Sequence, residues 1–166
     1  AWWKATLKNW PLENYIKLAD RLNKEYGANI LVVCGPSEEE IGEKVKKSVK
    51  NKNKIIILEK QNLKNTATII ENCDLFVSSD SGVMHVAEAM NVPIIMIPGY
   101  TLFKFSGVYK KENRRNILWK PLKCYEKCPV MWEFAEEFEG REDKIPCKIE
   151  CYRNITPEQV LNKVNK

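Results

Sequence analysis

Four short apolar segments, separated by stretches with helical periodicity, constrain the fold of this chain more than any other feature. The segments are NILVVC (29–34), KIIIL (54–58), DLFVSS (74–79) and VPIIMIP (92–98). Nearly continuous apolar runs of this length are typical of strands that are buried on both faces, as in a parallel sheet. Because parallel neighbours are joined by right-handed crossovers, the alternation predicts an α/β fold, with helices on both faces of a parallel sheet.

Helical patterns fill the intervals between these segments. The first pattern has Pro11 near its start and Gly27 at its end, as expected for the two termini of a helix. Ser37 and Thr156 are the expected N-caps of the second helix and of the last one. Further helices are expected over 38–49, 63–72, 81–90 and about 156–165, and a last strand over 116–120.

The composition favours one globular domain that covers residues 1–166. Hydrophobic residues make up 44% of the chain and charged residues 30%, which excludes a disordered polar chain. The longest apolar runs are too short to span a bilayer, and there is no signal-peptide pattern. The chain opens with AWWKATLKNWP rather than with Met, so we expect a domain of a longer protein. The net charge of +5 suits a phosphate-bearing ligand or an anionic membrane surface without requiring nucleic acid.

An acid, a hydroxyl, a glycine and the single histidine of the chain come together at Asp80, Ser81, Gly82 and His85. They follow a predicted strand and open a predicted helix, which is where open α/β sheets bind ligands. Amides at a helix start bind anions, glycine permits close approach of the backbone, and a histidine one turn later can donate to a phosphate oxygen. The pattern therefore predicts a phosphate site. A structural role stays open, in which Asp80 only caps the helix, whereas the absence of a G-x-S-x-G elbow disfavours a Ser–His nucleophile.

Three segments carry a resemblance to a known family. DLFVSSDSGVMHVAEAMNVPIIMIPG resembles the pattern D-x-x-[IV]-[ST]-x-D-[ST]-G-x-x-H-x-A-A of glycosyltransferase family 9, the ADP-heptose:lipopolysaccharide heptosyltransferases. LKNWPLENYIKLADRL is similar to the K-x-W-P element of that family, and GPSEEE is similar to its G-x-x-x-E element. The segments come in the family's order and cover residues 8 to about 101.

The resemblance implies a Rossmann-like domain, the carboxyl-terminal half of a GT-B type glycosyltransferase, which binds the nucleotide-sugar donor. It implies a donor site formed by Lys8, Glu38, Asp80, Ser81, Gly82, His85 and Thr101. Without the resemblance, Lys8 would be read as a surface lysine. For Glu38 a second reading stays open, in which it only complements the dipole of a helix.

The implied reaction is inverting transfer of a sugar from an ADP-heptose-like donor to a lipopolysaccharide-type or other glycan acceptor. The resemblance implies that no cofactor is required and that the general base lies in an amino-terminal domain outside this chain. It also implies a cytoplasmic protein, at the inner face of the cytoplasmic membrane with at most peripheral contact. Val83 stands where many relatives have proline, and Trp2, Trp3 and Lys4 stand where small hydroxyl residues are common. The sugar is therefore not fixed as heptose.

Four of the six cysteines form two pairs within a cysteine-rich segment at about 121–152. The pairs are Cys124 with Cys128, and Cys147 with Cys151. A structural Zn site, disulfides and free thiols all remain open, since two pairs suit zinc but C-x2-C is its commoner spacing. We expect a structural and not a catalytic role. Cys34 and Cys73 lie in or beside apolar segments and are expected to be small core residues.

Two further classes of function compete with the glycosyltransferase reading. One is a zinc-stapled nucleic-acid module, for which the basic stretch YKKENRR (109–115) offers some support. The other is a regulatory domain that binds a nucleotide without catalysis. The regular α/β alternation favours a small-molecule site, so we expect no nucleic-acid partner.

Overall fold

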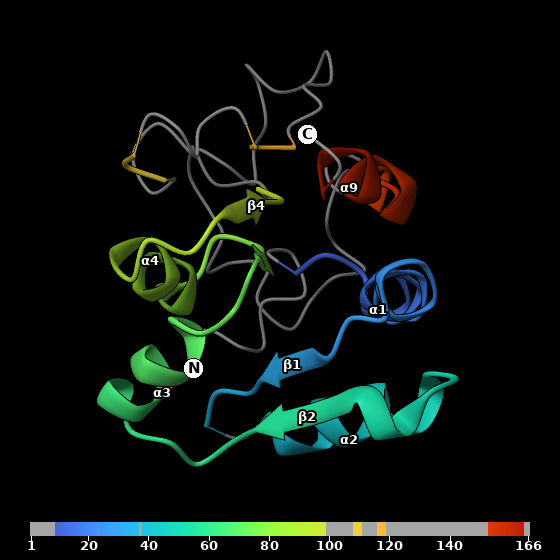
Figure 1. The fold of residues 1–166 in the computed structure, drawn as a ribbon, viewed down its shortest axis with the longest axis horizontal. Helices are drawn as coiled ribbons and strands as arrows, with labels where there is room; N and C mark the ends of the chain where they lie inside the picture. Colours follow the sequence, from blue (N-terminus) through green and yellow to red (C-terminus); the bar gives the residue numbers. More distant parts are fainter. Residues whose placement is uncertain (1–8, 37, 99–107, 111–115, 119–152, 165–166) are drawn as a thin grey trace, which may run out of the picture.

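We analysed a computed structural model of the chain, which describes residues 9–36, 38–98, 108–110, 116–118 and 153–164. Strands and helices alternate along this part of the chain, as the sequence predicts (Figure 1). In order, the elements are α1 (Leu12–Tyr26), β1 (Ile30–Val33), α2 (Glu39–Ser48), the 3-10 turn η2 (Lys52–Lys54), β2 (Ile55–Leu58), α3 (Leu63–Ile70), β3 (Phe76–Ser78), α4 (Gly82–Ala89), β4 (Ile94–Met96) and α9 (Pro157–Val164).

The strands pair in parallel, which confirms the predicted class of sheet. β1 pairs with β2, with Ile30 opposite Ile55, and β3 pairs with β4, with Phe76 opposite Ile94. Ile117 forms one further parallel bridge to β4. The strand predicted at 116–120 is therefore reduced to this bridge within the described residues, and positions 119 and 120 lie outside them.

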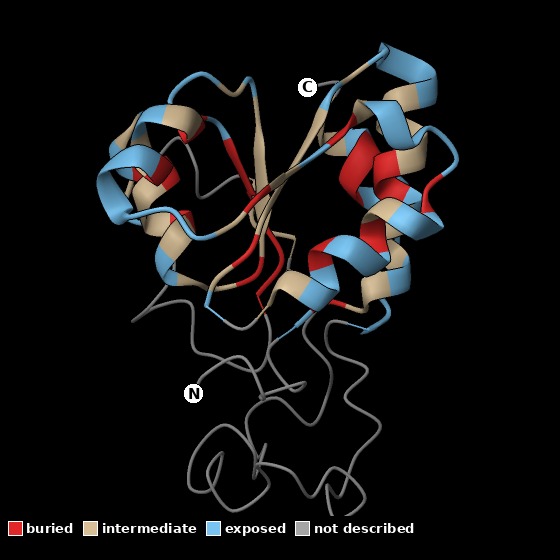
Figure 2. Ribbon diagram, turned by 90° about the horizontal axis from the view of Figure 1, so that it is seen from below, coloured by how far each residue is buried: buried red, intermediate tan, exposed pale blue. Residues whose placement is uncertain are grey.

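Helices cover both sides of the strands (Figure 2). α1 packs against α2 and α9, whereas α3 packs against α4. The buried positions of the helices lie on the sides that face the strands, and their outer sides are exposed (Figure 2). This arrangement confirms the predicted α/β fold. No helix in the described part of the chain has the length and apolar character needed to cross a bilayer.

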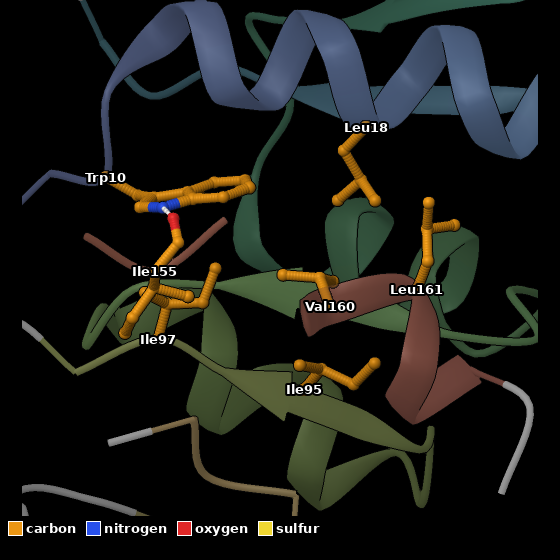
Figure 3. Packing of buried hydrophobic residues seen from close by; sticks show 7 residues of the cluster. All are labelled: Trp10, Leu18, Ile95, Ile97, Ile155, Val160 and Leu161. Atoms are coloured by element: carbon orange, nitrogen blue, oxygen red, sulfur yellow. Dashed lines mark hydrogen bonds between the residues drawn. The ribbon is translucent and has the colours of Figure 1, made fainter. Parts of the chain in front are cut away.

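One hydrophobic cluster joins the beginning of the described chain to its end. The cluster brings together side chains from α1, β4 and α9 and from the residues next to these elements (Figure 3). Its buried members are Trp10, Leu18, Ile95, Ile97, Ile155, Val160 and Leu161. The indole Nε1 of Trp10 donates a hydrogen bond to the Ile155 carbonyl at 2.8 Å. Residues far apart in sequence therefore share one core.

The helix caps agree with the sequence in two places and differ in one. Gly27 ends α1 with φ of 64°, in the left-handed region that favours glycine. The Thr156 hydroxyl accepts from the Gln159 amide, and the Gln159 side chain accepts from the Thr156 amide, which is a capping box. The expected cap of α2 was wrong, because Glu38 occupies the N-cap position and the helix begins at Glu39. Ser37 lies outside the described residues.

Candidate functional site

Ser81 sets the geometry of the loop between β3 and α4. Its backbone is extended and its hydroxyl accepts a hydrogen bond from the Met84 amide at 3.3 Å, which makes it the N-cap of α4. The Ser78 hydroxyl lies 3.0 Å from the same oxygen. Thus Ser81, and not Asp80, caps the helix, and half-buried Asp80 lies directly before it. The amides of Gly82 and Val83 belong to the first turn, whose N–H groups have no acceptor within the helix.

Gly82 leaves the surface above the first turn of α4 open. A Cβ atom built on Gly82 would meet no atom of the described residues within 4 Å, and the residue is exposed. Neither packing nor a left-handed backbone therefore requires glycine at this position. A ligand phosphate that approaches the first-turn amides would use this open space.

His85 lies one turn after Ser81, as the sequence predicts. Its side chain is 32% exposed, yet its Nδ1 atom is buried and has no hydrogen-bond partner in the described part of the structure. The exposure therefore comes from the rest of the ring. Nδ1 lies 3.9 Å from a carboxylate oxygen of Glu88, and the ring of Tyr109 lies 5.3 Å from the imidazole between centroids.

A buried hydroxyl ties the beginning of α1 to this loop. Ser79, which is buried, directly precedes Asp80; its hydroxyl accepts from the Trp10 amide at 3.3 Å and lies 3.3 Å from the Tyr15 hydroxyl. The sequence analysis missed this link, and its signal was the K-x-W-P element itself. Lys8 lies outside the described residues, but it is only two positions from the anchored Trp10 amide.

Removal of the Tyr15 hydroxyl is expected to change how stability depends on pH. Burial raises the pKa of Tyr15, although its hydrogen bond with Ser79 partly opposes this. Because the pKa is raised in the folded state, the folded protein holds the Tyr15 proton to a higher pH than the unfolded chain does. The contribution of Tyr15 to the free energy of unfolding is therefore fully present below the unfolded pKa of about 10 and is lost as the pH rises further. Tyr15→Phe should therefore flatten the alkaline loss of stability, as measured by urea unfolding between about pH 8 and 11.

Tyr26, near the end of the same helix, provides the matched control. It is 46% exposed. Tyr26→Phe should leave the alkaline slope as it is in the unmodified chain. An equal slope in Tyr15→Phe and the unmodified chain would contradict the assigned role of the buried hydroxyl.

Glu38 is held by the turn that follows β1. Its carboxylate Oε2 accepts a hydrogen bond from the Gly35 amide at 2.7 Å. This contact explains why Glu38 takes the cap position of α2, since the side chain is directed back towards the strand end. Glu38 therefore lies beyond the carboxyl end of β1, just as Asp80 lies beyond that of β3. Its predicted role near the nucleoside stays a prediction.

Several predicted site residues lie outside the described part of the chain. They are Lys8, Thr101 and the paired cysteines Cys124, Cys128, Cys147 and Cys151. Within the described ranges, no group of three or more His, Cys, Asp or Glu side chains could hold a metal ion. Cys34 is buried and Cys73 is half-buried, which agrees with their expected place in or beside the core, and burial raises the pKa of both thiols.

Comparisons with known proteins agree with the fold. The model of the family described as glycosyltransferase family 9 (heptosyltransferase) matches residues 3–131, which include the Asp80–His85 loop. Lipooligosaccharide heptosyltransferase 2 of Haemophilus influenzae is 32% identical over 97 residues, 57% of this chain and 28% of the relative. The protein of that name from Campylobacter jejuni serotype O:6 is 25% identical over 169 residues, 96% of this chain and 46% of the relative.

Solved structures show the same fold. A glycosyl transferase family 9 protein from Veillonella parvula superimposes with a TM-score of 0.73 at 23% identity, covering 96% of this chain and 42% of that one. The E. coli ADP-heptose lps heptosyltransferase II also gives a TM-score of 0.73, at 21% identity, with 96% and 41% covered. The chain thus spans less than half the length of these relatives. Because the family model matches well over half of its residues, the chain belongs to glycosyltransferase family 9, the heptosyltransferase family.

Proposed function

We propose that this chain is the donor-binding domain of an inverting glycosyltransferase, and that the start of α4 binds the diphosphate of an ADP-heptose-like nucleotide sugar. The observation that carries the proposal is the open first turn of α4. Its cap is made by Ser81, its surface is open at Gly82, and His85 lies one turn later. The family match covers all three residues.

The chemistry of sugar transfer explains why such a site is useful. When an acceptor hydroxyl attacks the anomeric carbon, negative charge develops on the departing diphosphate, and fixed donors stabilise that charge. The first-turn amides of α4 and the imidazole of His85 are such donors. Lys8 and Thr101 are proposed to complete the site, and Glu38 and Asp80 to contact the nucleoside and the sugar.

The acceptor and the general base are proposed from the resemblance and from the names of the relatives. Both of these relatives are called lipooligosaccharide heptosyltransferase 2, which supports a lipopolysaccharide-type acceptor. The location at the inner face of a membrane is proposed from the resemblance alone. We place the general base in an amino-terminal domain outside this chain. This chain alone should then bind donor with little turnover, and transfer at the rate of a full-length relative would contradict that placement.

Calorimetric titration with ADP tests the site. We expect the unmodified chain to bind ADP, and Gly82→Ala and His85→Ala each to weaken binding about tenfold or more, equivalent to about 1.4 kcal/mol. The added methyl group in Gly82→Ala meets no atom of the part of the chain that the structure describes, so it should leave the free energy of unfolding within about 0.5 kcal/mol of its original value. Weaker ADP binding by Gly82→Ala, without a loss of folding stability, would show that ADP occupies the open space above Gly82.

The control for this experiment is the choice of nucleotide. UDP and GDP should be titrated under the same conditions, because the diphosphate is common to all three and the base is not. Binding of UDP or GDP instead of ADP would show that the donor carries a different nucleotide and would leave the proposed diphosphate site in place. If none of the three bound, or if Gly82→Ala bound ADP as well as the unmodified chain, the proposed site would be wrong.

A further inference from the structure

We infer that Glu88 is a positioning residue for His85, and that the pair couples ADP binding to the uptake of a proton. The inference rests on the proposed donor site, because it assigns a protonation change to one of its residues. The sequence analysis did not single out Glu88, although a lone acid in the otherwise apolar helix 82–89 was a signal.

The Glu88 carboxylate is fixed in place within the protein. The residue is only 4% exposed. Its Oε2 atom accepts from the Tyr109 amide at 3.0 Å, and its Oε1 atom accepts from the Lys110 amide at 2.9 Å. The Lys110 ammonium donates to the Glu88 carbonyl and to the Asn91 side chain. These bonds hold the carboxylate and the 109–110 backbone against α4.

The imidazole of His85 lies close to both this carboxylate and an aromatic ring. Its buried Nδ1 atom is 3.9 Å from Glu88 Oε2, which is beyond hydrogen-bonding distance. The Tyr109 ring lies 5.3 Å from the imidazole between centroids, and the Tyr109 backbone is held by Glu88. A small rotation of the imidazole would bring Nδ1 into hydrogen-bonding contact, and such contacts commonly shorten when a ligand binds.

The two neighbours of the imidazole in the ligand complex would both be acceptors. An ionised carboxylate accepts hydrogen bonds and donates none, and the same holds for ionised phosphate oxygens. A neutral imidazole has only one N–H, so it cannot donate to Glu88 and to phosphate at once. We therefore expect ADP binding to draw a proton from solvent, which forms one N–H bond and converts His85 to imidazolium. Of the described titratable groups, Glu88 and Tyr109 lie next to this ring. The Lys110 ammonium, which is bonded to the Glu88 carbonyl, is a nearby cation that opposes the added charge.

Proton uptake can be measured by titrating ADP into the chain at about pH 8, in buffers with different ionisation enthalpies. The phosphates of ADP are past their ordinary pKa of about 6 at this pH, so the free nucleotide contributes little to the proton balance. The unmodified chain should take up as much as about one proton per ADP bound. His85→Gln should take up none, and Glu88→Gln should take up less than half of the original value and bind ADP about five- to tenfold more weakly.

Lys110→Met is the matched control. It removes the ammonium bonds to Glu88 and Asn91, so it loosens the same segment, but it keeps the carboxylate beside His85. A merely structural role of Glu88 predicts that Lys110→Met and Glu88→Gln behave alike. The proposed role predicts that proton uptake survives in Lys110→Met and falls in Glu88→Gln.

Nitrogen NMR of the unmodified chain gives a readout that does not depend on whether Glu88→Gln folds. His85 is the single histidine, so its imidazole signals are assigned without ambiguity. Both ring nitrogens should carry protons in the ADP complex at about pH 8, and only one in the free chain. ADP binding without proton uptake and with an unchanged imidazole would overturn this inference and leave the proposed donor site intact. If the chain bound no nucleotide diphosphate, both would be overturned.

Discussion

Replacement of Trp10 by alanine is expected to lower the free energy of unfolding by about 3–5 kcal/mol. The side chain is 2% exposed and belongs to the cluster that joins α1, β4 and α9. Its ring meets Tyr15 edge-on, with centroids 4.9 Å apart. Because the cavity would lie between three elements that are distant in sequence, the surroundings cannot close it by a local shift.

Urea unfolding followed by circular dichroism measures this loss. Trp10→Phe is the matched control, since it keeps an aromatic ring in the core but removes the donor to the Ile155 carbonyl. It should cost about 1–3 kcal/mol, the range for a buried polar group left without its partner. A loss below about 1 kcal/mol for Trp10→Ala would show that the three elements do not depend on this side chain.

Replacement of Gly42 by valine is expected to cost about 2–3 kcal/mol through overpacking. A Cβ atom at this position would lie 2.7 Å from Cys34 Sγ and 2.9 Å from Ile57 Cγ2, so α2 would have to move away from β1 and β2. Glycine in a helix interior normally weakens it, and a replacement would normally stabilise it. Here the close packing of helix on sheet outweighs that preference.

Thermal and urea unfolding of four variants test this explanation: Gly42→Val, Cys34→Ala, the double variant and Gly82→Ala. The nearest atom to the added Cβ is Cys34 Sγ. The double variant Gly42→Val with Cys34→Ala removes this atom, so it should recover part of the stability lost in Gly42→Val. Gly82→Ala is the comparison at an open position, where an added Cβ meets nothing within 4 Å. A stable Gly42→Val, or a double variant in which the two losses simply add, would contradict direct packing between Gly42 and Cys34.

The elements of the fold could be predicted because each helix or strand corresponds to a local pattern of apolar residues in the sequence. The strand segments at 54–58 and 92–98 are apolar runs, and β2 and β4 lie within them. The predicted ends of the strands were less accurate, because the length of a strand depends on the neighbouring strand with which it forms hydrogen bonds. Of the apolar run 92–98, only Ile94–Met96 forms a strand. At α2, Glu38 takes the cap position that was predicted for Ser37, and its carboxylate accepts a hydrogen bond from the Gly35 amide, a contact that no periodic pattern indicates.

The local part of the site could be predicted for the same reason. Ser81, Gly82 and His85 are neighbours on one helix turn, so spacing alone brings them together. The support around them is long-range: Ser79 is bonded to a residue 69 positions away, and Glu88 to residues 21 and 22 positions away. No periodicity in a single sequence indicates such pairs, because they depend on how the layers pack.

The bond between Trp10 and the Ile155 carbonyl has a consequence for the order of folding. It spans 145 residues, so closure of this contact must wait until nearly all of the described chain has been synthesised. Contacts of such high sequence separation form slowly. The long loop between the two residues must lose conformational entropy before the contact contributes stabilising free energy. On the ribosome, the Asp80 loop would therefore emerge long before the core beneath it is complete. A nascent chain truncated before residue 155 should therefore lack the carbonyl that fixes the Trp10 side chain, although the Trp10 amide can already bond to Ser79 beside Asp80.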